Sequence, residues 1–333
     1  MGPGDSPFSF GLTGATARYV DQWSPEDNAR IFPELKNSAF NRPDVVADLN
    51  VDRLSAFDDA SQDFVIASHV FEHLVEPLGQ MADAYRVLRP GGSLLIFLPD
   101  RRRTFDRDRR PTALDHLIAE YEQGVTELDD AHLIEFTDNV PEDWGDAPPP
   151  RDNAERFARH RARSIHVHCW AEEEFRDVLL YMIENLGTAW ELIDRLGVDD
   201  VPDGMEFGII LRRPATPIPA ELAAARFRLV WQSLTARADE SRAAAANLDQ
   251  LQAESAGVAT QVAGMTAQLA AVQQELEQDL EQARQELELA RQDLQRAQAV
   301  IASHERVLGP LRRAGVLAFA RRVAGWVRKP KRA

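Results

Sequence analysis

The sequence predicts an α/β domain with a doubly wound, mostly parallel sheet, followed by a long α-helical coiled coil. Up to about residue 213, short apolar runs alternate with segments whose apolar residues recur at helical spacing. Pro214-Ala-Thr-Pro-Ile-Pro219 then interrupts any helix. From there to about Leu308 the chain is rich in Ala, Gln, Glu, Leu and Arg, and nearly free of proline and aromatic residues.

Five short apolar segments are the expected strands, because each is bounded by polar or turn residues and suits burial on both faces. They are Ala17–Val20, Asp44–Asp48, Phe64–Ser68, Ser93–Leu98 and Phe207–Leu211. Helices are expected at Pro77–Leu88, which Pro90-Gly91-Gly92 would end, and at about Ala171–Leu186. The polar stretch from Arg101 to Arg163 is expected to be a long, mobile insertion.

Charge and cysteine content limit the classes of function. The 333 residues carry a formal net charge of −16. Because Leu311 to Ala333 contains eight basic and no acidic residues, the rest of the chain carries −24. An acidic body repels phosphates, which argues against nucleic acid as its partner. Cys169 is the single cysteine, which fits a reducing, cytoplasmic compartment.

Polar residues follow three of the predicted strands at their carboxyl ends, where open α/β sheets bind ligands. Asp21 follows the first strand, Asp48-Leu49 the second and Ser68-His69 the third. A carboxylate can accept hydrogen bonds from the hydroxyls of a ribose or from an adenine amino group, and Leu49 can cover the base. An aspartate after a strand is also a common turn or capping residue, so each signal is weak alone.

The order of these motifs is similar to that of class I S-adenosylmethionine-dependent methyltransferases of the small-molecule type. The resemblance rests on Ser68-His-Val-Phe-Glu-His-Leu74 and Tyr85-Arg-Val-Leu-Arg-Pro-Gly-Gly92, and it covers about residues 1 to 105. It implies a Rossmann-like fold and S-adenosyl-L-methionine as the cofactor. The implied cofactor-binding residues are Gly2 and Gly4 for the methionine part, Asp21 for the ribose, Asp48 and Leu49 for the adenine side, and Ser68 and His69 near the sulfonium.

The resemblance also implies that one strand is missing. In that family an apolar strand with an acidic end leads into the glycine turn and lies at the centre of the sheet. This chain begins at Met1-Gly2-Pro3-Gly4, so two neighbouring strands are expected to lack their shared partner. A misassigned start codon or a fragment would explain the difference.

Two histidines are candidate general bases for an oxygen nucleophile. His166 and His168 lie in Ser164-Ile-His-Val-His-Cys-Trp170, and alternate residues of an extended segment point the same way, here toward one cleft. Local packing or hydrogen bonding is the alternative role for both. No metal site is expected, because the sequence shows no third ligand beside them.

The C-terminal part carries two further patterns. Apolar residues at spacings of three and four from Val262 to Ile301 form a heptad seam with a stutter near Leu276, which predicts a homo-oligomer. Beyond Pro310 a helix would align Phe319 and Trp326 opposite basic residues. That arrangement is typical of peripheral contact with an anionic membrane, with nucleic acid as the competing partner.

Together these patterns predict four regions: a methyltransferase domain at 1–213, a linker and helix at 214–240, a coiled coil at 241–308 and a basic amphipathic tail at 309–333. The predicted function is methyl transfer from S-adenosyl-L-methionine to a small-molecule or glycan acceptor in cell-surface polysaccharide biosynthesis. The enzyme would be cytoplasmic, with peripheral contact to the inner membrane face. The alternative is a catalytically degenerate domain that serves as a coiled-coil scaffold.

Overall fold

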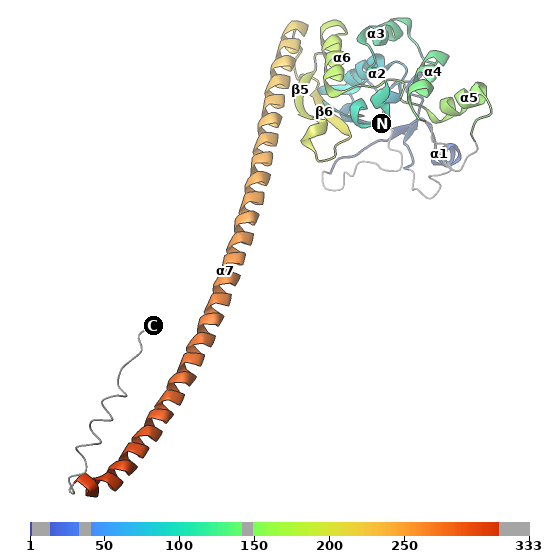
Figure 1. Ribbon diagram of the computed structural model, residues 1–333. Coiled ribbons are helices and arrows are strands. Elements are labelled where there is room, and N and C mark those ends of the chain that lie inside the picture. The colour runs from blue at the N-terminus through green and yellow to red at the C-terminus, as the bar shows by residue number, and fades with distance from the viewer. Residues whose placement is uncertain (2–13, 33–40, 142–148, 313–333) are drawn as a thin grey trace. The chain divides into compact units, whose positions relative to one another are not determined.

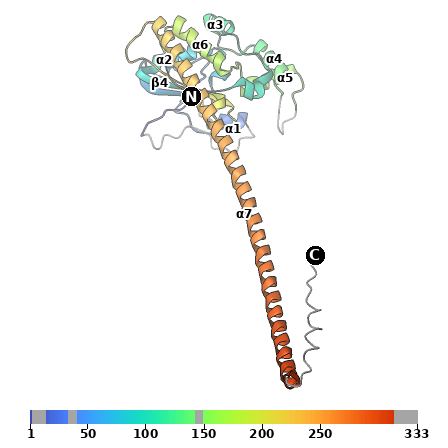
Figure 2. The ribbon, with the colours of Figure 1, turned by 60° about the vertical axis from the view of Figure 1, so that its left-hand side comes forward.

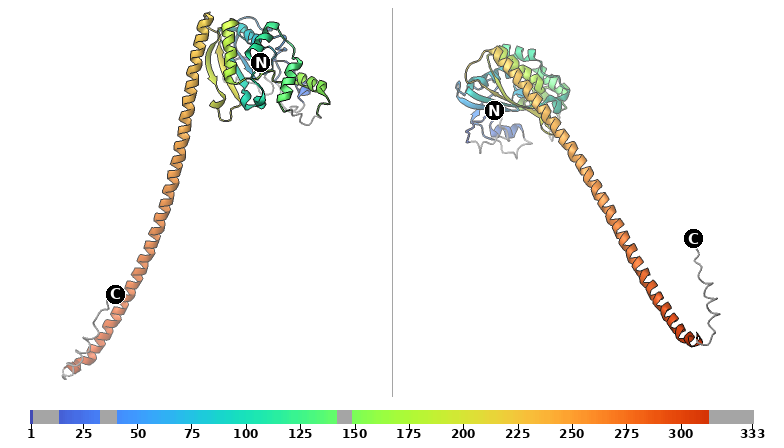
Figure 3. Two further views of the ribbon diagram at one scale, coloured as in Figure 1. Left: turned by 45° about the horizontal axis from the view of Figure 1, so that its top comes forward. Right: turned by 90° about the vertical axis from the view of Figure 1, so that its left-hand side faces the viewer.

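The computed structural model describes residues 1, 14–32, 41–141 and 149–312, with side chains up to residue 303 (Figure 1). The chain divides into two compact units, Met1–Ala245 and Ala246–Ala333. In the second unit, the described residues all belong to α7 (Ala220–Arg312), a single unbroken helix (Figure 3). None of the described helices is long and apolar enough to cross a lipid bilayer.

The strands of the first unit form two sheets. β1 (Val20–Asp21) and β2 (Val45–Val46) pair in parallel. The second sheet has the order β3 (Gln62–Ser68), β4 (Leu88–Pro99), β6 (Glu206–Arg212) and β5 (Glu191–Leu196). β3 and β4 are parallel, whereas β6 runs antiparallel to both of its neighbours. This alternation of strands and helices confirms the predicted Rossmann-like α/β fold.

Met1 lies between the two sheets. Among the described residues, no strand lies beside β1 or β3 on the sides away from β2 and β4. The ammonium group of Met1 donates a hydrogen bond to the carbonyl of Ile66 in β3 (2.7 Å). Burial lowers the pKa of this ammonium to about 6, although the charge of Asp21 acts in the opposite direction. In the part of the chain that the structure describes, β1 and β3 have no shared partner strand.

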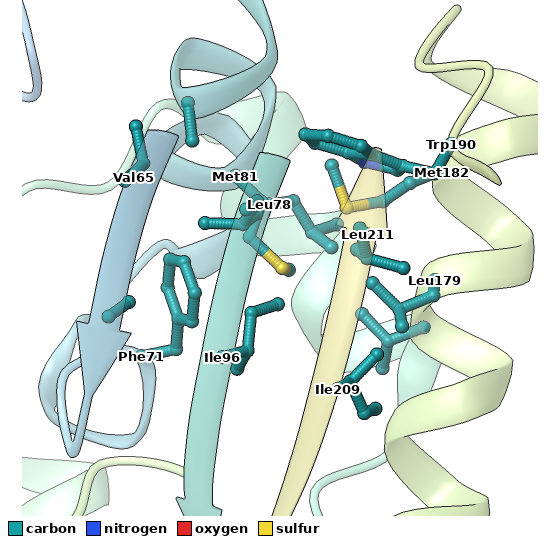
Figure 4. Packing of buried hydrophobic residues seen from close by; sticks show 14 of the residues in the cluster. Val65, Phe71, Leu78, Met81, Ile96, Leu179, Met182, Trp190, Ile209 and Leu211 are labelled. Carbon is teal, nitrogen blue, oxygen red and sulfur yellow. The ribbon is translucent and has the colours of Figure 1, made fainter. Parts of the chain in front are cut away.

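The main core lies between the four-stranded sheet and the helices α2 (Pro77–Val87) and α6 (Glu172–Asn185). α2 begins where Pro77 occupies its first turn and the carboxylate of Glu76 accepts a hydrogen bond from the backbone nitrogen of Gly79 (2.6 Å). Each helix buries one apolar face against the strands. Figure 4 shows this packing for Val65, Phe71, Leu78, Met81, Ile96, Leu179, Met182, Trp190, Ile209 and Leu211.

The predicted turn at Pro90-Gly91-Gly92 is a bulge inside β4. Gln62 pairs with Leu88, but Phe64 pairs with Ser93, so the residues between Leu88 and Ser93 loop out of the ladder. Gly91 has a φ of +85°, which favours glycine. A Cβ on Gly92 would lie 2.9 Å from a backbone oxygen, so this position has no room for a side chain.

The first turns of α7 belong to the domain core. Ala223, Ala224, Phe227 and Trp231 are buried in the same cluster as the sheet residues. Arg228 pairs with Glu184 of α6 across the surface. A cavity of about 250 Å³ remains between β5 and this part of α7, lined on the helix side by Phe227 and Val230. The compact unit therefore continues through the proline-rich segment into the helix.

The described residues between Arg101 and Arg163 form three α-helices, where a long mobile insertion was expected. They are α3 (Leu114–Gln123), α4 (Asp130–Asn139) and α5 (Asn153–Arg163). α4 and α5 lie side by side (Figures 1 and 2), and in Figure 1 they are on the side of the first unit away from β5. A small apolar cluster joins α4 to the segment after α5, with Phe157 of α5 packed against it, and its buried members are Leu133, Phe136, Val140, Ile165 and Val167. These helices are rich in charged residues and have only a narrow apolar face, so their sequences show little of the apolar periodicity that predicts a helix. The same applies to α1 (Pro25–Ile31), which was also not predicted.

Candidate cofactor and catalytic site

The first part of the candidate site lies at the carboxyl ends of β1 and β2. Asp21 ends β1 in register with β2, and Asp48 follows β2. Asp21 accepts a hydrogen bond from the backbone nitrogen of Trp23 (3.3 Å), and Asp48 from that of Asn50 (2.9 Å). The amide of Gln22 also donates to Asp48 (3.2 Å). Both carboxylates are partly exposed on adjacent strand ends, and both also stabilise their own turns.

The turn after β2 is fixed to the segment that follows β3. Leu49 is buried in the main core. The side-chain oxygen of Asn50 accepts a hydrogen bond from the backbone nitrogen of Val75 (2.8 Å). Met1 contacts Ile66 of β3 and lies near Asp21 of β1. These contacts place the turns after β1 and β2 close to β3 and the segment that follows it.

Ser68 ends β3, and His69 follows it with a φ of +52°, which is uncommon for residues other than glycine. The backbone nitrogen of His69 donates to the carbonyl of Phe97 (3.0 Å), which fixes this turn against β4. The imidazole lies 3.2 Å from Glu72 and 2.8 Å from Glu206. The adjacent carboxylate of Glu72 is the main cause that raises the pKa of His69 to about 9, and Glu206 contributes as well. His69 is therefore an imidazolium at neutral pH.

A run of polar side chains continues from His69 to His166. Buried Glu72 lies 4.0 Å from Nε2 of His73. The rings of His73 and His166 meet edge to face, with their centroids 4.9 Å apart. Nδ1 of His166 lies 2.6 Å from Oδ2 of Asp106. Burial lowers the pKa of His73, so this ring is neutral where it lies between His69 and His166.

Asp106 is buried and held by Arg109. Nη1 of Arg109 donates to Oδ1 of Asp106 (2.8 Å) and to the carbonyl of His166 (2.7 Å). Burial by itself would raise the pKa of Asp106, but the hydrogen bonds from His166 and Arg109 outweigh it, and the pKa is lowered. A fixed carboxylate behind an imidazole holds the ring in one orientation, as a general base requires.

His168 lies in a different group from His166. Its side chain is 1% exposed, with Nε2 3.4 Å from Oε2 of Glu120 and 3.1 Å from the carbonyl of Val75. Burial lowers its pKa to about 3, so the ring is neutral. A ring without solvent access does not reach an acceptor in an open cleft. The predictions that both histidines face one cleft and that His168 acts as a base are therefore contradicted by its position.

The segment that carries both histidines is anchored to the preceding insertion. The backbone nitrogen of Cys169 donates to the hydroxyl of Thr112 (3.1 Å), and the backbone nitrogen of Thr112 donates to the carbonyl of Cys169 (3.0 Å). The thiol of Cys169 donates to the carbonyl of Arg110 (3.3 Å). Burial raises the pKa of this thiol to about 12, so the sulfur stays protonated.

Several residues of this site were not predicted from the sequence. Glu72 was visible in the motif that carries the family resemblance, but nothing marked it as a partner of His69. Asp106 and Arg109 lie in the polar stretch, where no periodicity or motif distinguishes them. Gly2 and Gly4, predicted for the methionine part of the cofactor, lie outside the described residues.

Comparison with known proteins identifies the N-terminal part of the chain. Residues 8–96 match the family model of a methyltransferase domain. No curated protein matches the chain. Over residues 8–96, the predicted resemblance to S-adenosylmethionine-dependent methyltransferases is thus confirmed, and S-adenosyl-L-methionine is the cofactor that this resemblance implies.

Solved structures with low similarity include three methyltransferases. A possible histamine N-methyltransferase from Thermotoga maritima is 15% identical, with 47% of this chain and 58% of that chain covered and a TM-score of 0.25. A carbon methyltransferase is 14% identical, with coverages of 64% and 47% and a TM-score of 0.32. A protein from Methanosarcina mazei is 16% identical, with coverages of 65% and 91% and a TM-score of 0.34. The match thus spans only about half the length of the first two.

The described residues fit the adenosine part of the cofactor. Asp21 and Asp48 present two partly exposed carboxylates on neighbouring strand ends. Hydroxyl and amino groups donate hydrogen bonds, and carboxylates are their strongest acceptors among side chains.

Proposed function

We propose, from the premise that residues 8–96 form a class I S-adenosylmethionine-dependent methyltransferase domain, that this chain methylates an oxygen atom of a small-molecule or glycan acceptor. S-adenosyl-L-methionine supplies an activated methyl group, so the protein mainly has to align the acceptor with it. The observation that carries the proposal is the pair of Asp21 and Asp48 at the carboxyl ends of adjacent parallel strands.

Cofactor binding is tested by isothermal titration calorimetry of the full chain with S-adenosyl-L-methionine. Asp21→Asn keeps the size of the side chain but removes its charge, and we expect at least about tenfold weaker binding, because charge-assisted hydrogen bonds are the stronger ones. Asp63→Asn is the matched control, since Asp63 is exposed at the opposite end of β3 and pairs with Arg89. Equal binding by the two variants would contradict the site. No binding by the wild type would favour the scaffold alternative.

His166 is the general base in this proposal. With Nδ1–H donating a hydrogen bond to Asp106, the lone pair lies on Nε2, the nitrogen that would accept the proton of the acceptor's hydroxyl. Asp106 stabilises the imidazolium that forms, and Arg109 keeps Asp106 in position. A hydroxyl needs such a base more than an amine does, which is why we favour oxygen as the methylated atom.

The base is tested by methyl transfer from isotope-labelled S-adenosyl-L-methionine to small-molecule and glycan extracts of a deletion strain. His166→Ala is expected to lower the rate by about 10²- to 10⁴-fold without changing cofactor affinity, because general-base catalysis contributes that factor. His160→Ala, in the same polar stretch, is the control and should leave the rate unchanged. Label in a glycan fraction would support a role in cell-surface polysaccharide biosynthesis, whereas unchanged transfer by His166→Ala excludes the base.

Self-association through α7 is the second part of the proposal. The large apolar residues of the heptad seam between 262 and 301 are each more than half exposed. They are Val262, Met265, Leu269, Val272, Leu276, Leu280, Leu287, Leu294 and Ile301. An apolar stripe of this length gains free energy by pairing with a second copy. Sedimentation of the full chain should give an oligomer that Leu269→Asp dissociates and Gln268→Asp does not. A monomeric wild type would disprove it.

Membrane contact through the tail stays a prediction, because residues 313–333 lie outside the described residues. Flotation of the full chain with anionic vesicles tests it. Binding that is lost when the tail is removed would support peripheral attachment, and absence of binding would exclude it.

A further inference from the structure

Four potential metal ligands converge outside the proposed methyl-transfer site. His116 and Glu120 lie one turn apart on α3, His132 lies in the first turn of α4, and His168 precedes α6. One ligand atom from each of these residues lies within 4.8 Å of all the others. In the sequence, His168 has only His166 as a nearby candidate ligand. The fold brings it close to His116, Glu120 and His132, which lie 36 to 52 positions earlier in the chain.

Three of these atoms, from His116, Glu120 and His132, are spaced like one face of a coordination tetrahedron. Nε2 of His116 lies 3.0 Å from Nε2 of His132, and Oε1 of Glu120 lies 3.2 Å and 3.1 Å from these nitrogens. Nε2 of His168 lies 3.4 Å from Oε2 of Glu120. Zinc binds imidazole and carboxylate ligands at about 2.0–2.1 Å in tetrahedral geometry, which gives ligand–ligand edges of about 3.3 Å.

The environment of the cluster favours a bound cation. The side chains of His168, Glu120 and His132 are 1%, 8% and 11% exposed, whereas His116 is 46% exposed. Among the described residues, no hydrogen bond of good geometry reaches Oε2 of Glu120 or Nδ1 of His168. A buried carboxylate surrounded by imidazoles is costly unless a cation compensates its charge.

Asp129 contacts the nitrogen of His132 that faces away from the cluster. Its carboxylate lies 2.8 Å from Nδ1 of His132 and also accepts a hydrogen bond from the backbone nitrogen of that residue (3.0 Å). A carboxylate on the far nitrogen of a histidine fixes the ring and raises its basicity, as at most histidine metal sites.

We propose that His116, Glu120, His132 and His168 bind one divalent transition-metal ion, with zinc as the expected occupant. Imidazole ligands select zinc and its neighbours over magnesium or calcium. The ion would join α3 and α4 to the segment before α6, and this segment also carries His166. Four protein ligands suit a structural role. Metal binding by these four side chains does not require methyl transfer.

Metal content and geometry of the full chain test the proposal. Protein purified with zinc, passed through gel filtration and analysed by mass spectrometry of its elements should retain one zinc per chain. Replacement by Co²⁺ should give the visible absorption bands of a tetrahedral site. His132→Gln should lower zinc affinity at least a hundredfold, and Asp129→Asn, which keeps the helix cap, by about 10- to 100-fold.

Two further variants serve as controls. His160→Ala, on α5, should bind zinc as the wild type does. His73→Ala alters a second group of potential ligands, made of Glu72, His73 and His166, and should also retain zinc. Zinc should raise the melting temperature of the wild type but not that of His132→Gln. A wild type without stoichiometric zinc overturns the proposal, as does binding that survives His132→Gln or is lost with His73→Ala.

Discussion

Replacing Phe227 with alanine tests whether the first turns of α7 are part of the domain core. The side chain is 1% exposed and stacks on Trp231, with ring centroids 5.9 Å apart. Truncating a buried phenylalanine costs about 3–5 kcal/mol in the free energy of unfolding. Phe227 already lines a cavity of about 250 Å³ on one side, so it has fewer contacts to lose there. We therefore expect a cost at the lower end, about 3 kcal/mol.

Urea unfolding of the full chain, followed by tryptophan fluorescence, measures this cost. Leu229→Ala is the matched control, because it lies two residues away on the same helix and is 67% exposed. It should change the free energy of unfolding by less than about 0.5 kcal/mol, as other exposed substitutions do. If both variants lost the same stability, or if Phe227→Ala lost less than about 1 kcal/mol, this part of α7 would not be core.

Three other changes test the site, the core and the bulge. His69→Gln should remove a stabilisation that is present below pH 6.5 and lost as the pH rises through about 9, because the folded state raises the pKa of His69. Since His69 is 47% exposed, screening limits this effect to about 1 kcal/mol, measurable by urea unfolding at pH 6 and pH 10. Arg195→Met leaves its buried partner Glu172 without a counterion and should lower the free energy of unfolding by about 3–5 kcal/mol. Arg30→Met, in an exposed pair with Asp27, should not change the free energy of unfolding measurably. Gly92→Ala forces a Cβ against the backbone oxygens of Arg89 and Asp63, and thermal melting should show a loss of about 1–3 kcal/mol in the free energy of unfolding. Gly257→Ala, which lies in open space on α7, should instead stabilise the helix.

The buried strands could be predicted from the sequence because burial on both faces leaves continuous apolar runs. Phe64–Ser68 and Ser93–Leu98 both lie within observed strands, β3 and β4. β5 was missed, since Glu191, Asp194 and Arg195 interrupt an edge strand of the sheet with charged side chains. Edge strands need fewer apolar residues, so the alternation that identifies a strand is weak there.

The candidate site was predictable only where it follows strand ends. Asp21, Asp48 and His69 could be found because ligands bind at the carboxyl ends of parallel strands. Asp106 and the cluster around His168 depend on how the insertion folds back, which no local pattern encodes. The one local signal was His116 with Glu120, which lie at i and i+4 on one helix face.

The protonated, buried thiol of Cys169 gives this chain a built-in reporter of local opening. Only the thiolate attacks alkylating reagents, so the folded protein should react slowly and only when the stretch around Cys169 separates from Thr112 and Arg110. The alkylation rate of Cys169 therefore measures how often this stretch opens, without any engineered probe. It would also reveal which added ligand holds the two stretches together.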